Sequence, residues 1–111
     1  MWIDKKFKIV ENIIKKVAFK DMSLLDLGAR DQFLKKFIPS DIKYTGVDRF
    51  QNNNNNLIIN LDDNFEEIGE KYDVIAALDV IEHLDEPLAF YENCKKYSKK
   101  LLLINFPNQA Y

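Results

Sequence analysis

Acidic side chains follow several apolar stretches of this sequence, at the positions where strands are expected to end. They are Asp26, Asp48 and Asp79, with Asp62 and Asp63 after a further stretch. In open α/β sheets, ligands bind beyond the carboxyl ends of the strands. A carboxylate at a buried edge costs desolvation free energy, so several together indicate a ligand with matching donors. Any one acid alone could instead cap a helix or turn a loop, and it is their recurrence at one edge that favours a binding site.

A glycine and an acid stand at the spacing of a nucleoside site. Gly28 follows the first apolar stretch, where it allows a sharp turn and a close approach to a ligand. Asp48 lies 20 residues further on, the spacing at which an acid reaches a ribose diol. The dinucleotide fingerprint needs further glycines where this chain has Arg30 and Phe33. An adenosine-containing ligand without a pyrophosphate therefore fits better than a nicotinamide dinucleotide.

The elements that must position these residues alternate between helices and strands. Apolar residues recur every three or four positions over 3–18, which predicts an amphipathic helix. A second helix is predicted over 32–38, with Asp31 as its N-cap and Pro39 after its end. A third opens at 85–87, and its predicted buried side comprises Leu88, Phe90, Tyr91, Cys94 and Tyr97. The predicted strands span 23–27, 43–48, 57–61, 72–78 and 101–106.

The strands are apolar at nearly every position, which is typical of a parallel sheet buried on both faces. Their alternation with helices predicts an α/β sandwich with crossover connections. Residues 49–56, which include the run QNNNNN, are too few for a helical crossover. We expect a solvated loop there, with the strand 57–61 at an edge of the sheet.

Length and composition bound the remaining possibilities. The 111 residues predict a single small domain. The net charge of −2, and only two arginines among 16 basic residues, give no clear nucleic-acid signature. The single cysteine excludes an intramolecular disulfide and fits a reducing compartment. No apolar run approaches the roughly 20 residues that span a membrane, so we expect a cytoplasmic protein without a membrane segment.

Four segments in order resemble the class I S-adenosylmethionine-dependent methyltransferases. LLDLGARDQ is similar to their first motif, GVDRF to their acidic second-strand motif, and LLLINFPN to their fifth strand. The most specific match, YDVIAALDVIEHLDEP, resembles the Methyltransf_11/23-like branch. The resemblance implies a Rossmann-like three-layer sandwich, with a mostly parallel sheet of about five strands in the order 3-2-1-4-5 and flanking helices. It also implies that residues 1–111 form one domain that lacks the family's C-terminal strands.

The resemblance implies S-adenosyl-L-methionine as the cofactor and gives each motif a role. Asp26 would orient the loop and the methionine ammonium group. The main chain of Gly28, Ala29 and Arg30 would line the methionine and the ribose, although Arg30 and Gln32 replace two glycines of the family motif. Asp48 would bind the ribose hydroxyls.

The other implied cofactor contacts concern the adenine and the reacting end. Arg49 would lie beside the adenine, Asn60 would accept a hydrogen bond from its amino group, and the Leu61 N–H would reach the ring. Three consecutive residues would pass near the sulfonium and its methyl group: Leu78, Asp79 and Val80.

The resemblance implies methyl transfer to an unidentified acceptor, and His83 is the candidate general base. His83 could instead make only local hydrogen bonds. No metal ion is expected, and the alternative ligand set is Asp79, Glu82 and His83. The other function to consider is a non-catalytic or degenerate S-adenosylmethionine-binding subunit. The strand 101–106 is apolar on both faces, so its edge could meet a second copy or a partner subunit.

Overall fold

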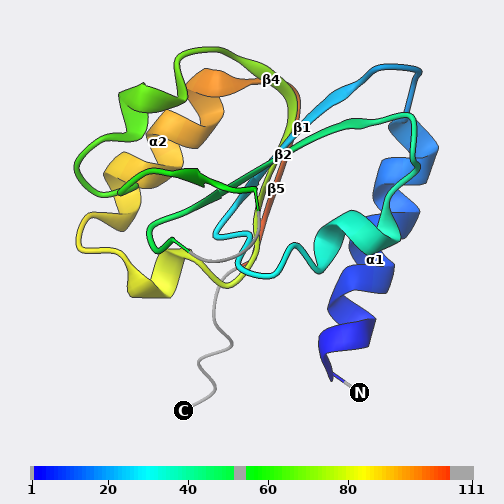
Figure 1. The fold of residues 1–111 in the computed structure, drawn as a ribbon, viewed down its shortest axis with the longest axis horizontal. Helices are drawn as coiled ribbons and strands as arrows, with labels where there is room; N and C mark the ends of the chain where they lie inside the picture. Colours follow the sequence, from blue (N-terminus) through cyan, green and yellow to red (C-terminus); the bar gives the residue numbers. More distant parts are fainter. Residues whose placement is uncertain (1, 52–54, 106–111) are drawn as a thin grey trace.

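The computed structural model describes residues 2–51 and 55–105, without the side chains of 2–4. These residues form a five-stranded sheet in the order β3-β2-β1-β4-β5, in which every pair of neighbours is parallel (Figure 1). This confirms the predicted Rossmann-like α/β sandwich and its strand order. The strands are β1 (Ser23–Leu27), β2 (Lys43–Asp48), β3 (Leu57–Ile58), β4 (Tyr72–Ala77) and β5 (Ser98–Ile104).

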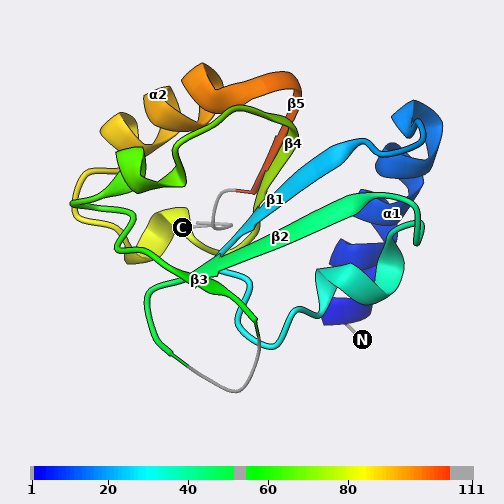
Figure 2. The same cartoon turned by 45° about the horizontal axis from the view of Figure 1, so that its top comes forward.

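Helices cover both faces of the sheet. The helix α1 (Trp2–Val17) lies on one face, and α2 (Pro87–Tyr97) lies on the other (Figure 2). Three short 3₁₀ helices join these elements: η1 (Leu34–Phe37), η2 (Phe65–Ile68) and η3 (Ile81–His83). Among the described residues, no helix is long and apolar enough to cross a membrane.

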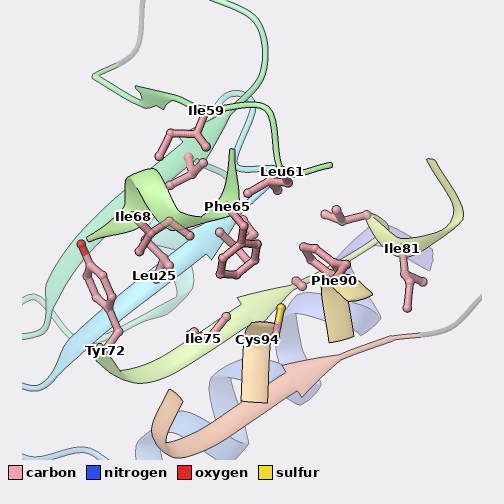
Figure 3. Packing of buried hydrophobic residues seen from close by; sticks show 14 residues of the cluster. Leu25, Ile59, Leu61, Phe65, Ile68, Tyr72, Ile75, Ile81, Phe90 and Cys94 are labelled. Carbon is pink, nitrogen blue, oxygen red and sulfur yellow. The ribbon is translucent and has the colours of Figure 1, made fainter. Parts of the chain in front are cut away.

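The alternation of side chains along each strand divides the core into two layers. Leu24 and Val74 point to the α1 side, where they join a cluster that contains Ile14. On the opposite side Ile75 belongs to the cluster that contains Phe90 and Cys94 of α2 (Figure 3). Each such buried side chain contributes roughly 1.5–3 kcal/mol relative to exposure, so both layers hold the sheet and fix the ends of its strands.

Two predicted elements are much shorter in the structure. The helix predicted over 32–38 is only the 3₁₀ turn η1, and Asp31 is not its N-cap. Gln32 has a φ of 59°, a left-handed conformation that cannot belong to a right-handed helix. The strand predicted over 57–61 ends at Ile58, because the chain then turns and buries Ile59 and Leu61 in the α2-side core.

Smaller differences concern the last third of the chain. The strand β4 ends at Ala77, and β5 begins at Ser98, before the predicted start at Leu101. Phe106, the predicted end of that strand, lies outside the described residues. The prediction that α2 buries Leu88 is wrong, because this side chain is 78% exposed. As predicted, β3 lies at an edge of the sheet, and residues 49–51 and 55–56 form no helix.

Candidate functional site

A cavity of about 430 Å³ opens at the carboxyl ends of the central strands. Its size lies within the range of small-molecule sites, and its place is the one where open α/β sheets bind ligands. The lining residues come from the segments that follow β1, β2, β3 and β4: Gly28, Arg30, Asp48, Arg49, Phe50, Asn60, Leu61, Asp62, Asp79, Val80, His83 and Leu84.

The structure thus brings most of the predicted cofactor residues together around one cavity. Three predicted residues do not line it: Asp26, Ala29 and Leu78. Two lining residues, Phe50 and Leu84, were missed from the sequence, and Asp62 was expected among the acids at the strand ends without an assigned cofactor contact. Phe50 and Leu84 each adjoin a residue that was predicted, but the path of the chain beyond a strand decides which neighbour faces the cavity.

The loop after β1 turns at Gly28. Its φ is 73°, and a Cβ there would come within 2.6 Å of Cγ2 of Val80, so the position excludes a larger residue. The N–H groups of Gly28 and Ala29 donate to the carbonyl of Val47, at 2.8 and 2.9 Å. These bonds join the start of the loop to the end of β2, which places Gly28 at the cavity wall.

Asp48, at the end of β2, is held by main-chain donors. Its Oδ2 accepts from the N–H of Arg30 at 2.8 Å, and its Oδ1 accepts from the N–H of Phe50 at 3.2 Å. The residue is 8% exposed. A carboxylate oxygen has more than one acceptor position, so Asp48 can keep these bonds and also accept from hydroxyl groups in the cavity.

Asp79, after β4, is held by side chains from two distant elements. Lys6 of α1 forms an ion pair with it, and its Oδ1 accepts from Nδ2 of Asn105 at 2.7 Å. Burial favours a higher pKa for Asp79, but the bonds from Lys6 and Asn105 and the positive charges of Lys6 and Arg30 outweigh it and lower the pKa. Asp79 is therefore ionised at neutral pH. Lys6 and Asn105 were not predicted, since no local pattern reveals such long-range contacts.

Asp26 lies beneath the site, on the α1 side of the sheet. It is 5% exposed, and its Oδ2 accepts from the hydroxyl of Tyr44 at 2.5 Å. Burial raises the pKa of Asp26 to about 7, with the Tyr44 bond opposing this change and the charge of Asp48 adding to it. Asp26 is therefore placed to support the neighbouring strand β2 through Tyr44, and it does not line the cavity.

The segment after β3 supplies Asn60, Leu61 and Asp62 to the cavity lining. Asn60 accepts from the N–H of Asp62 through its Oδ1, at 3.0 Å, which fixes the turn that follows the strand. The segment after β2 supplies Arg49 and Phe50, and the guanidinium of Arg49 lies 5.0 Å from the centre of the Phe50 ring. Phe50 is 67% exposed, so the lining offers a flat aromatic surface and a polar amide to a planar ligand group.

His83 ends η3 at the rim of the cavity. Its side chain is 61% exposed, and its Nε2 lies 3.7 Å from Oε1 of Glu82. A base at the rim can reach an acceptor that arrives from solvent. Within residues 2–51 and 55–105, no group of three His, Cys, Asp or Glu side chains could hold a metal ion, so the alternative set Asp79, Glu82 and His83 gains no geometric support.

The sheet order defines a doubly wound α/β fold, with the cavity at the point where that order reverses. A family model described as a methyltransferase domain matches residues 4–110. The chain therefore belongs to this family, whose members are class I methyltransferase-like domains. No match was found among curated proteins or among solved structures.

Proposed function

We propose that this protein is an S-adenosylmethionine-dependent methyltransferase domain and that the cavity binds this cofactor. The observation that carries the proposal is the buried Asp48 carboxylate, which is fixed at the cavity wall beside Gly28. A fixed anion that retains acceptor capacity is suited to a vicinal diol. The donor set fits the cofactor, because acids, an amide and an aromatic ring follow one another around a cavity of suitable size.

In this proposal, different residues contact different parts of the cofactor. Asp48 binds the ribose hydroxyls, and the main chain from Gly28 to Arg30 lines the methionine and ribose. Phe50 and Arg49 cover one side of the adenine, while Asn60 and Leu61 contact its edge. At the reacting end are Asp79 and Val80, supported by Leu78, and Asp26 acts indirectly through Tyr44.

When bound, S-adenosylmethionine supplies an electrophilic methyl group. The protein aligns an acceptor with it, which is the main requirement of an in-line displacement. The exposed imidazole of His83 takes the proton of a hydroxyl or amine acceptor. The carboxylate of Asp79, ionised beside Lys6, provides negative charge near the cationic sulfonium of the cofactor.

We also propose that residues 1–111 act as one domain in the cytoplasm, a location with which the single free cysteine is compatible.

A further proposal concerns the open edge of β5. Among the described strands it pairs only with β4, and Leu101 to Ile104 are half-buried on both faces. An edge of this kind is a template for pairing, so we expect a second copy or a partner to cover it. Light scattering at micromolar concentration tests this, and a monomer with a well-protected β5 contradicts it.

Thermal unfolding with a panel of ligands tests the proposed cofactor. A ligand at 100 times its Kd stabilises a protein by about 2.7 kcal/mol. We expect S-adenosylmethionine and S-adenosylhomocysteine to raise Tm, and NAD at the same concentration to leave it unchanged. Asp48→Asn should reduce the shift, whereas Asp41→Asn, a change of an exposed acid before β2, should not. A shift with NAD alone would contradict the proposal.

A further inference from the structure

The polyasparagine run ends in a residue that contacts the loop after β1. Asn56, the last asparagine of the run, is half-buried, whereas the adjacent Asn55 is exposed. Its Nδ2 donates to the carbonyl of Arg30 at 2.8 Å, and its Oδ1 accepts from Nε2 of Gln32 at 2.7 Å. The side chain thus bridges two residues that are 24 and 26 positions away.

The two contacted residues have conformations that are unfavourable for their type. Arg30 has a φ of 49° and Gln32 a φ of 59°. Such left-handed conformations cost free energy in any residue that carries a Cβ, and glycine avoids this cost. A loop with two such residues relaxes unless surrounding contacts determine its shape.

Contacts on both sides of Arg30 supply that support. Its N–H donates to Asp48, at 2.8 Å, and its carbonyl accepts from Asn56. The two peptide groups that flank Arg30 are therefore both fixed, one by the end of β2 and the other by the segment before β3. Arg30 itself lines the cavity, so these bonds determine the shape of the cavity wall.

A glycine in β2 makes room for the bridging side chain. A Cβ at Gly46 would lie 2.2 Å from Oδ1 of Asn56 and 3.1 Å from Nε2 of Gln32. Gly46 is buried in the interior of the strand, and glycine there is itself costly. The absent side chain thus lets Asn56 and Gln32 meet over β2.

We propose that Asn56 is a positioning residue that holds residues 28–32 in the conformation that forms the cofactor wall of the cavity. This assignment rests on the proposed function for its effect on binding, whereas its effect on the loop does not. Asn56 does not line the cavity, so its influence is exerted through Arg30 and Gln32. The polyasparagine run therefore ends in a residue that holds the loop after β1, although the composition of the run alone predicts a solvated loop.

The first test compares Asn56→Ala with the matched control Asn55→Ala. Because two hydrogen bonds are lost, we expect Asn56→Ala to weaken S-adenosylhomocysteine binding about tenfold by calorimetry. Amide hydrogen exchange at Arg30 and Gln32 should quicken by a similar factor, and Asn55→Ala should change neither. Gly46→Ala, which displaces the same side chain from the other side, should reproduce the effect of Asn56→Ala.

The second test asks whether the effect is conformational. In a chain that carries Arg30→Gly, which keeps both hydrogen-bond partners of Asn56, the loop needs less support for a left-handed residue, so adding Asn56→Ala should weaken binding less than about threefold. An equal loss in both backgrounds would overturn the assignment, as would unchanged exchange in Asn56→Ala. If the unmodified protein fails to bind S-adenosylhomocysteine, the proposed function falls, and the exchange rates alone decide the role of Asn56.

Discussion

The two acids that flank the central strand at the cavity are held in different ways. Asp48 follows β2, is 8% exposed, and accepts from two main-chain N–H groups of nearby loops. Asp79 follows β4, its side chain is 47% exposed, and it contacts two side chains, Lys6 and Asn105. One carboxylate is therefore fixed by the backbone, and the other by groups that have their own rotational freedom.

This difference indicates which half of the cavity is preorganised. Main-chain donors cannot move without moving the loop, so Asp48 presents the same acceptor positions before and after a ligand binds. Lys6 and Asn105 can change rotamer, and an ion pair that is partly exposed is weakened by salt. Ribose recognition should therefore be insensitive to salt, while the region around Asp79 should adapt to conditions and to the acceptor.

The largest expected effect is that of Asp48→Ala. In the proposed complex the change removes a pair of charge-assisted bonds to the ribose, which should cost roughly 2–4 kcal/mol of cofactor binding. Calorimetric titration with S-adenosylhomocysteine measures it, with far-ultraviolet circular dichroism to establish that the variant folds. Binding as tight as that of the unmodified protein would show that Asp48 does not contact the ribose.

Asp26→Asn tests whether the buried Asp26 holds a proton in the folded protein. A carboxyl whose folded pKa is raised stabilises the fold fully below its unfolded pKa, near 4, and loses this contribution as pH rises through its folded pKa, about 7. The asparagine has no such titration and can still accept from Tyr44. At pH 8 the variant should be more stable by about 1–4 kcal/mol, with little difference at pH 4.

Urea unfolding at pH 4, 6 and 8 provides this measurement. The difference between the two proteins should appear between pH 4 and 7 and stay constant above that range. Asp41→Asn, a change of an exposed acid, serves as the control. A variant that is equally stable at every pH would mean that Asp26 does not hold a proton in the folded protein.

A smaller effect is expected for Lys6→Met, which leaves Asp79 without its ion pair. An exposed pair contributes roughly 0–1 kcal/mol, so stability at pH 7 should fall by that amount in dilute buffer. The lowered pKa of Asp79 gives stability that is present above its unfolded pKa and lost as pH falls through its folded pKa. This acid-side loss should be smaller in the variant.

The salt dependence of stability distinguishes the Lys6–Asp79 ion pair from the exposed lysines of α1. Urea unfolding in low and high salt should show that the difference between the unmodified protein and Lys6→Met shrinks at high salt. Lys5→Met is the matched control, because Lys5 is exposed. A salt-independent difference would mean that Lys6 stabilises the protein by packing of its aliphatic stem.

The sequence predicts the central strands well because β1 and β4 are buried on both faces and read as continuous apolar runs. It predicts the acids at the strand ends for the same reason, since each follows such a run directly. It fails for the segment 32–38, where the N-cap candidate Asp31 and the following Pro39 suggest a helix but do not reveal the left-handed Gln32. It also fails for Lys6, Asn56 and Asn105, because their partners lie 24 or more residues away and only the fold brings them together.

Calorimetric titration of the unmodified protein with S-adenosylhomocysteine, at low and at high salt, is the decisive measurement for the proposed cofactor site. We expect saturable binding of one ligand per chain, at an affinity that salt changes little, since in the proposed complex Asp48 and the main chain make the main contacts. Absence of heat under both conditions, together with no change in Tm, would contradict the claim that this cavity is a cofactor site.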